Sequence, residues 1–241
     1  LKEVKRASLA GSLRRRKETI GDVDFLVVSD NPAKVMDYFV SLPGVKKIWG
    51  KGGTKASVHM AAGFDMDLRV VPEKSYGAAL QYFTGSQAHN IVTRKMAIDK
   101  GLKLSEYGVF KGAKMIAGKT EEEVYKAIGL PYIEPEIRED QGEVGAALEK
   151  KLPTLIELKD IKGDLHCHSN WNGGEQSIEV MAKTAMDRGY EYIGISDHSK
   201  TLKIENGLNE KQLLKQHEAI KKINEKFNKE GIGFRVLHGV E

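Results

Sequence analysis

The sequence predicts three consecutive parts: an α+β domain, a mainly helical stretch and the beginning of a parallel α/β domain. Three observations support this. Short apolar runs typical of strands surround one helix over about the first 70 residues, which is the pattern of an α+β layer. Helical spacing then dominates. After a charged stretch that contains glycine, strands and helices alternate, as they do in parallel βα units.

The composition is that of a globular chain. The 241 residues carry 38 Lys and Arg against 34 Asp and Glu, and 40% are hydrophobic, which argues against wholesale disorder. No apolar run approaches the roughly 20 residues of a membrane helix, so we expect no membrane contact. A single cysteine excludes an internal disulfide and favours a reducing compartment. With no signal peptide, we expect a cytoplasmic location.

The first part is expected to be one helix among several strands. The predicted elements are a strand at 25–28, a helix at 32–42, a hairpin formed by residues 48–49 and 56–60 around a Gly-rich turn, and a strand at 66–71. Apolar runs bounded by turn residues predict the strands, and an apolar residue at every third or fourth position predicts the helix.

The second part is expected to be helical up to a boundary near Pro131 and Pro135. Helices are predicted at 76–83 and 89–100. A third begins at Thr120, where three glutamates in its first turn favour the helix dipole. Residues 139–160 are charged and weakly periodic, and we interpret them as a linker.

The third part alternates between strands and helices. Strands are predicted at 164–168, 192–195 and 234–240, and helices at 178–187 and 209–227. This alternation predicts parallel strands joined by crossover helices. Because the sequence begins with Leu1 rather than Met and ends at Glu241 within an apolar run, we expect it to be a piece of a longer protein.

Paired aspartates stand at the start of two predicted strands. Asp22 and Asp24 are two residues apart, so they project from the same face of a strand. Asp65 and Asp67 repeat the pattern on what is expected to be a neighbouring strand. Three such carboxylates can hold two divalent ions for phosphoryl or nucleotidyl transfer, and their hard oxygens suit Mg²⁺ or Mn²⁺. The alternative is a solvated acidic pair.

Basic residues are concentrated near the beginning of the chain. Residues 1–20 hold seven Lys or Arg against two Glu. A cluster of this kind suits a polyanion such as a nucleic acid. A solvated basic surface would produce the same pattern.

Four motifs in residues 9–138 resemble the family X DNA polymerases, the DNA polymerase beta superfamily. They are Gly11-Ser12-Leu13-Arg14-Arg15, Gly21-Asp22-Val23-Asp24-Phe25-Leu26, Asp67-Leu68-Arg69 and Tyr82-Phe83-Thr84-Gly85-Ser86. The first two occur in nucleotidyltransferases generally, whereas the last is more specific to template-dependent members. The resemblance implies a nucleotidyltransferase palm over residues 1–73 and a thumb over 74–138.

The same resemblance implies roles for individual residues. Asp22, Asp24 and Asp67 would be the catalytic metal ligands, with Asp67 activating the primer 3′-hydroxyl. The remaining implied contacts are Ser12, Arg15 and Gly21 with the β- and γ-phosphates, Tyr82 and Phe83 with the sugar of the nucleotide, Gly85 as a point of close backbone approach, Asn90 with the base, and Arg94 with the template. Asp65 departs from the family, because relatives often carry a basic residue there. Gln87 and His89 also differ from the best-known member.

A second candidate site begins with His166 and His168, two residues apart on a predicted strand. Both imidazoles share one face, which is a good start for a metal site. His198 and Glu241 follow the next two strands, at the edge where barrel active sites form. The alternative is a pair of ordinary surface histidines. We expect Cys167, on the opposite face, to be a small buried hydrophobic residue.

Residues 161–241 resemble the N-terminal part of a PHP (polymerase and histidinol phosphatase) domain, an α/β barrel that is incomplete here. The resemblance implies that His166, His168, His198 and Glu241 bind metal, with Mn²⁺ or Zn²⁺ as the possible ions. Where the family usually has an aspartate, this sequence has Asn172-Gly173-Gly174. Either Glu175 replaces that ligand or it is absent. We expect the remaining ligands to lie beyond Glu241.

The resemblance implies a template-dependent DNA polymerase of prokaryotic origin that extends a primer with dNTP using two Mg²⁺ or Mn²⁺ ions, and we expect it to be a monomer. Its expected partner is gapped or primer–template DNA in gap or base-excision repair. The PHP domain of the full-length protein implies a 3′–5′ exonuclease or phosphoesterase. Two alternatives remain: a nucleotidyltransferase acting on RNA or a small molecule, and a non-catalytic fragment that only binds DNA.

Overall fold

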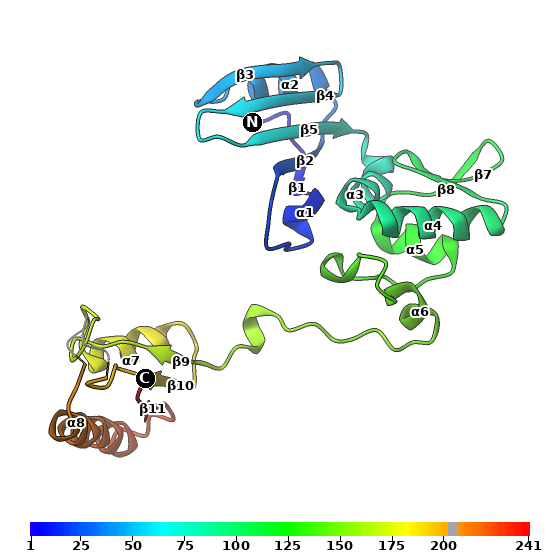
Figure 1. The fold of residues 1–241 in the computed structure, drawn as a ribbon. Helices are drawn as coiled ribbons and strands as arrows, with labels where there is room; N and C mark the ends of the chain where they lie inside the picture. The colour runs from blue at the N-terminus through cyan, green and yellow to red at the C-terminus, as the bar shows by residue number, and fades with distance from the viewer. Residues whose placement is uncertain (202–206) are drawn as a thin grey trace. The chain divides into compact units, whose positions relative to one another are not determined.

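The computed structural model describes residues 1–201 and 207–241. The chain forms two compact units, Leu1–Pro153 and Thr154–Glu241 (Figure 1). The boundary between the units lies within the predicted linker. None of the helices in the described residues is long and apolar enough to cross a membrane.

The first unit begins with a five-stranded sheet of strand order β1-β2-β5-β4-β3. Its elements are β1 (Arg6–Leu9), α1 (Gly11–Arg14), β2 (Asp22–Val28), α2 (Pro32–Val40), β3 (Val45–Lys51), β4 (Lys55–Met60) and β5 (Asp65–Val71). The predicted strands, helix and hairpin are confirmed. Neither β1 nor α1 is apparent in the sequence, because four residues are too few to show a periodicity.

Strand β2 is buried on both of its faces near its end. Val27 packs in the core beneath α2 with Val35 and Phe39. Leu26 and Val28 pack on the opposite face against the next helix, α3 (Tyr76–Thr84). A strand covered on both sides has apolar residues at consecutive positions, which explains the continuous run from Phe25 to Val28.

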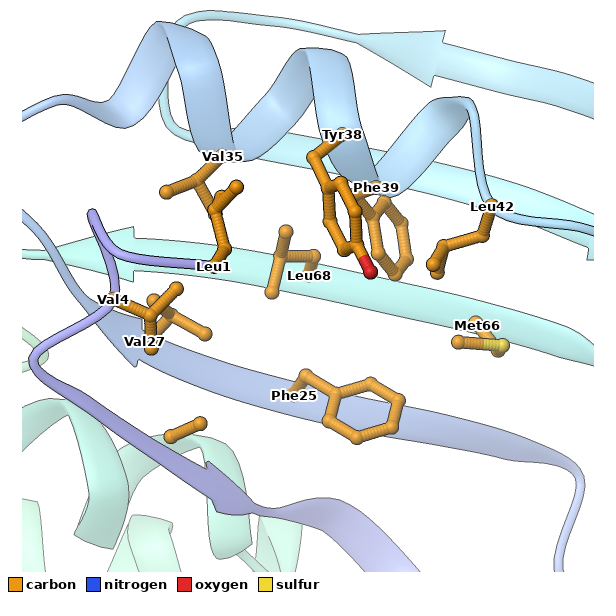
Figure 2. Close-up of a pocket in the computed structure, with 11 residues that line it drawn as sticks. Leu1, Val4, Phe25, Val27, Val35, Tyr38, Phe39, Leu42, Met66 and Leu68 are labelled. Carbon is orange, nitrogen blue, oxygen red and sulfur yellow. The ribbon is translucent and has the colours of Figure 1, made fainter.

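Helix α2 starts with a well-formed cap and covers one face of the sheet. Asn31 accepts a hydrogen bond from the Lys34 backbone nitrogen at 3.2 Å, and Pro32 occupies the first helical position. An apolar hollow of about 290 Å³ lies between this helix, the sheet and the start of the chain (Figure 2). Phe25, Leu68 and Tyr38 are among its lining residues.

The rest of the first unit contains both helices and a small sheet. Its elements are α3, α4 (Gln87–Asp99), β6 (Lys103–Ser105), β7 (Gly108–Lys111), β8 (Lys114–Ala117), α5 (Glu121–Ile128) and α6 (Glu143–Leu148), with short 3₁₀ turns at Glu73–Ser75 and Pro135–Ile137. The three antiparallel strands correct the expectation of a mainly helical stretch. Strands of three or four residues leave too short an alternation to be recognised.

Helix α6 corrects the predicted linker of residues 139–160. Val144 and Ala147 are buried in the same core as Val124, Tyr125 and Ile128 of α5. The segment is short and rich in Gly and Ala, so its apolar face is hardly visible in the sequence. Tertiary packing stabilises it, as is usual for a helix of this length.

The second unit is a three-stranded parallel sheet of order β11-β10-β9 with two long helices. Its elements are a 3₁₀ turn at Leu158–Asp160, β9 (Gly163–Cys167), α7 (Ile178–Asp187), β10 (Tyr192–Ile195), α8 (Glu210–Lys229) and β11 (Arg235–His238). Residues of α7, α8 and all three strands form or pack against one apolar core. The parallel alternation predicted from the sequence is confirmed.

Candidate functional site

The paired aspartates lie on the two adjacent central strands. Parallel pairing of β2 with β5 sets Asp22 opposite Asp65 and Asp24 opposite Asp67. Neighbouring strands run about 4.8 Å apart, and paired residues project from the same face. This is the face of the sheet to which Leu26 contributes, opposite to α2. The fold therefore brings together the three carboxylates predicted from the sequence.

The electrostatics of this cluster are those of an anionic site. Burial and the nearby charges of Asp22 and Asp67 raise the pKa of Asp24 to about 6. Lys55 lies 3.5 Å from Asp67 and offsets part of the charge. Hard oxygen ligands with excess negative charge fit Mg²⁺ or Mn²⁺. Within the described residues, however, the aspartates do not form a set whose ligand atoms all lie within 4.8 Å of one another.

Gly11 explains why the first motif begins with glycine. A Cβ atom there would lie 2.1 Å from Oδ2 of Asp24, and the backbone has a φ of +60°. Only glycine permits both the left-handed conformation and the close approach. The short helix α1, which carries Ser12, is thereby held against the carboxylate cluster. Gly21 is exposed immediately before β2.

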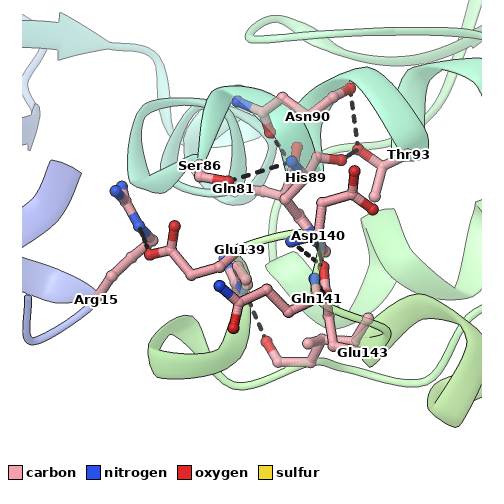
Figure 3. A network of polar contacts seen from close by, with 12 residues as sticks. Arg15, Gln81, Ser86, His89, Asn90, Thr93, Glu139, Asp140, Gln141 and Glu143 are labelled. Carbon is pink, nitrogen blue, oxygen red and sulfur yellow. Dashed lines mark hydrogen bonds and ion pairs between the residues drawn. The ribbon is translucent and has the colours of Figure 1, made fainter.

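Arg14, the last residue of α1, and Arg15, which follows it, form hydrogen bonds with residues that come after the five-stranded sheet in the first unit. The Nε atom of Arg15 donates to Glu139 at 2.8 Å (Figure 3). Its Nη1 donates to the Thr84 carbonyl at 2.6 Å. Arg14 forms two hydrogen bonds with the Glu121 carboxylate, at 2.9 and 2.6 Å. Arg15, predicted to bind phosphate, is thus paired with a carboxylate in this structure.

Tyr82 and Phe83 form an aromatic corner flanked by two arginines. Their rings meet edge to face at 5.1 Å, with Arg69 over Phe83 at 4.8 Å and Arg94 over Tyr82 at 5.7 Å. Both rings are partly buried. Gly85, which follows with a φ of +70°, lies close to Arg15. Of the residues predicted to bind the nucleotide, Arg15 after α1 and Gly85 after α3 therefore lie next to each other.

The Asn90 side chain is held within the protein. It donates to the Tyr82 carbonyl at 2.7 Å and accepts from Gln81 at 2.8 Å. Only 7% of the residue is exposed. These two bonds fix the orientation of the amide and leave one of its N–H hydrogens for a further contact.

Asp65 stands where relatives often carry a basic residue, and its carboxylate is bound by neighbouring side chains. It accepts hydrogen bonds from Trp49 at 3.0 Å and His59 at 2.6 Å. These bonds, Trp49 first, lower the pKa of Asp65 below its ordinary value. Asp65 is therefore ionised beside the three catalytic candidates and adds to the negative charge of this region.

The histidines of the second unit meet around one carboxylate. Oε2 of Glu241 lies 2.9 Å from His166 Nε2, 3.3 Å from His168 Nε2 and 3.5 Å from His198 Nδ1. Ligand atoms of His166, His168 and Glu241 all lie within 4.8 Å of one another. Two nitrogen donors and one oxygen donor fit a transition metal or Zn²⁺. All four predicted ligands are thus brought together.

Neighbouring residues support this cluster in ways the sequence left open. Asn172 is 4% exposed and accepts a hydrogen bond from the His198 backbone nitrogen at 3.2 Å. It therefore positions a loop of the cluster in the segment where an aspartate was expected. Glu175 is exposed. Burial raises the pKa of the Cys167 thiol to about 11, as expected for a partly buried residue in an apolar core.

Comparison with known proteins finds a matching family model and several similar chains. Residues 79–139 match the family model of the DNA polymerase beta thumb. The DNA polymerase/3′–5′ exonuclease PolX of Bacillus subtilis is 41% identical over 238 residues, which cover 97% of this chain. Repair DNA polymerase X of African swine fever virus is 30% identical over 141 residues, which cover 53% of this chain and 78% of the viral protein. A solved Leishmania infantum polymerase beta, in a ternary P/T complex, matches with a TM-score of 0.49 and 26% identity over 55% of this chain and 67% of that one.

This chain belongs to the family X DNA polymerases. It spans 41% of the length of the Bacillus relative. The first of the four motifs contacts two of the others in the fold. Its Gly11 lies against Asp24, and its arginines Arg14 and Arg15 donate hydrogen bonds to Thr84 at the end of α3.

Several supporting residues of this family X chain are not evident in the sequence. Glu121, expected only to favour a helix dipole, is 6% exposed and pairs with Arg14 and with the fully buried Arg138. His89 is buried between Glu143 and Tyr125. These partners are 17 to 107 residues apart along the chain, so spacing gives no signal for them.

Proposed function

We propose that the first unit catalyses template-directed DNA synthesis, in which a primer 3′-oxygen attacks the α-phosphorus of a dNTP and pyrophosphate leaves. The observation that carries the proposal is the register of β2 and β5, which pairs Asp24 with Asp67 and leaves Asp22 on the same face. We further propose that residues 1–73 are the palm and 74–138 the thumb.

The aspartates of the palm bind the metal ions, and one of them also accepts a proton. Asp22, Asp24 and Asp67 hold two Mg²⁺ or Mn²⁺ ions, which would lower the pKa of the primer hydroxyl and offset charge on the leaving group when bound. A carboxylate oxygen of Asp67 accepts the 3′-hydroxyl proton. The register of β2 and β5, on the face opposite α2, keeps the three carboxylates side by side before substrate arrives.

The aromatic corner and α1 bind the nucleotide and the DNA. Ser12, Arg15 and Gly21 bind the β- and γ-phosphates, since charged and backbone donors suit phosphate oxygens. Tyr82 and Phe83 pack against the sugar, Gly85 allows the backbone to approach, and Asn90 contacts the base. Arg94 binds the template strand, so affinity for gapped DNA falls as salt is raised.

Extension of one-nucleotide-gapped DNA with complementary dNTP tests this function. Asp22→Ala and Asp67→Ala should abolish nucleotide transfer while leaving DNA affinity nearly unchanged. Asp37→Ala is the matched control, because Asp37 is exposed on α2, on the other side of the sheet. Turnover in both triad variants would refute the site.

The same assay separates the two alternative functions. Transfer of a nucleotide to RNA or to a small acceptor, without templated extension, would assign a different nucleotidyltransferase. DNA binding without extension in either Mg²⁺ or Mn²⁺ would assign a binding fragment. A role in gap or base-excision repair is favoured by the viral relative, which is named a repair polymerase.

We also propose that residues 161–241 are the N-terminal part of a PHP domain whose full-length form hydrolyses DNA from the 3′ end. The supporting observation is the convergence of His166, His168 and His198 on Glu241, and the Bacillus relative is named a 3′–5′ exonuclease. Zn²⁺ or Mn²⁺ titration by calorimetry tests the site. His166→Ala should weaken binding, whereas His59→Ala, in the first unit, should not.

A further inference from the structure

We propose that Asp197 is a positioning residue that accepts the Nδ1 hydrogen of His168 and so presents Nε2 of that imidazole to the metal ion. The proposal rests on the PHP metal centre proposed above, and it assigns a role to a residue that the metal-ligand motif does not include. Three observations support the proposal: Asp197 is buried, each hydrogen bond around it donates toward its carboxylate, and Nδ1 of His168 has no hydrogen-bond partner among the described residues.

Asp197 is a fully buried carboxylate at the end of β10. It accepts hydrogen bonds from the Ser169 backbone nitrogen at 2.7 Å, the Ser169 hydroxyl at 2.5 Å and the Gln216 amide at 2.5 Å. Ser169 follows His168 directly, and Gln216 lies on α8. Three neutral donors from two elements therefore fix the carboxylate, but none of them supplies the positive charge that a buried anion favours.

The orientation of Gln216 follows from the next residue in the network. His238 Nε2 lies 3.1 Å from the Gln216 side-chain oxygen, and His217 Nδ1 lies 3.3 Å from His238 Nδ1. If His238 donates from Nε2, the Gln216 oxygen is occupied as an acceptor and its NH₂ group points to Asp197. Each bond in this row then donates toward Asp197, as an ionised carboxylate requires.

His168 supplies the missing partner. Its Nδ1 is buried and has no hydrogen-bond partner among the described residues, yet it lies only 3.9 Å from Oδ1 of Asp197. Its other nitrogen, Nε2, lies 3.3 Å from Glu241. Closing the gap to an ordinary hydrogen bond needs a shift of about 1 Å.

The chemistry of a metal-binding histidine requires such a partner. A neutral imidazole has one N–H group, so binding a metal through Nε2 leaves the hydrogen on Nδ1. A carboxylate that accepts this hydrogen fixes the tautomer and the ring orientation and makes the ligand nitrogen more basic. Stacking on His198, with ring centroids 4.5 Å apart, holds the plane of the His168 ring, and Asp197 would fix its rotation within that plane.

The tautomer of His168 can be read directly by long-range ¹H–¹⁵N NMR on the 241-residue chain. In Glu241→Ala at pH 8 without metal, where the carboxylate that competes for a hydrogen on Nε2 is removed, we expect the hydrogen on Nδ1. When Asp197→Asn is added, we expect this preference to be lost. Zn²⁺ affinity, measured by calorimetry with competing chelator, should fall by about 10- to 100-fold in Asp197→Asn alone.

Gln216→Ala is the matched control, because it removes a donor to Asp197 but leaves the carboxylate. A purely structural role for Asp197 predicts equal losses in both variants, whereas positioning predicts that Gln216→Ala retains the Nδ1–H tautomer and most of the Zn²⁺ affinity. If Asp197→Asn does not fold, the tautomer of Glu241→Ala alone still decides: hydrogen on Nε2 overturns the proposal.

The two proposals fail in different ways. A chain that binds no Zn²⁺ but carries the hydrogen on His168 Nδ1 would refute the metal centre and retain the contact with Asp197. A chain that binds Zn²⁺ through His166 and Glu241, with the His168 tautomer unchanged in Asp197→Asn, would retain the metal centre and refute the positioning role.

Discussion

The two candidate sites are built on sheets in different ways. The carboxylates of the first unit stand on adjacent central strands, so the backbone register itself places Asp24 beside Asp67. The histidine site uses the ends of three parallel strands and the loops after them, and its ligands converge on Glu241. A site set by strand register depends on the sheet, whereas a site set by strand ends depends on the side chains that hold its loops.

The largest expected effect is a loss of stability in the first unit, and it tests whether the two candidate sites are independent of each other. Arg138 is fully buried and pairs with Glu121, which also binds Arg14. Arg138→Met leaves a buried carboxylate with one cation fewer and should lower the free energy of unfolding of this unit by about 3 kcal/mol, measured by urea denaturation.

The matched control is Lys151→Met, which removes an exposed ion pair with Glu149 and should cost under about 1 kcal/mol. Zn²⁺ binding by the second unit should be unchanged in Arg138→Met. A parallel loss of Zn²⁺ binding would show that the two sites are not independent.

The next effect concerns the contact between α1 and the carboxylates. Gly11→Ala places a methyl group against Asp24 and should reduce nucleotide transfer at least tenfold while destabilising the unit by about 1–3 kcal/mol. Gly112→Ala separates the two causes, because Gly112 has a φ of +59° but open space around its Cβ position. Equal activity of the two variants would mean that only backbone strain, and not the approach to Asp24, matters.

The first unit should also lose stability as the solution becomes acidic. Burial lowers the pKa of His89 despite its hydrogen bond to Glu143. Below the ordinary pKa of histidine, near 6.5, the unfolded chain takes up a proton that the folded chain does not, so the free energy of unfolding falls. His89→Gln should flatten this dependence between pH 7 and pH 5 in urea titrations. An unchanged slope would assign it to other groups.

The smallest effect concerns Arg15. Its Nε atom donates a hydrogen bond to Glu139 (Figure 3). Glu139 also lies 3.6 Å from Lys17. An incoming triphosphate must compete with this carboxylate, so Glu139→Gln should bind dNTP a few-fold more tightly. Glu149→Gln, at an exposed glutamate, is the control. Weaker dNTP binding in Glu139→Gln would show instead that Glu139 orients Arg15 for the phosphates.

The sequence by itself determined the local features of both sites. Spacing of two residues put Asp22 with Asp24, and His166 with His168, on one face of a strand, because side chains alternate along an extended backbone. Short apolar runs bounded by turn residues predicted the central strands, and apolar residues at every third or fourth position predicted the longer helices. Short elements such as α6 and the strands β6–β8 escaped prediction, since a few residues show no periodicity.

Only the tertiary structure decided which distant groups meet. The pairing of β2 with β5 brings Asp67 to Asp24, the buried Glu121 receives arginines from both ends of its unit, and Asp197 comes to lie beneath His168. Strand register and burial depend on the packing of the whole core, and burial makes an unpaired charge or polar atom costly. The partners of such groups are therefore fixed by the completed fold rather than by their positions along the chain.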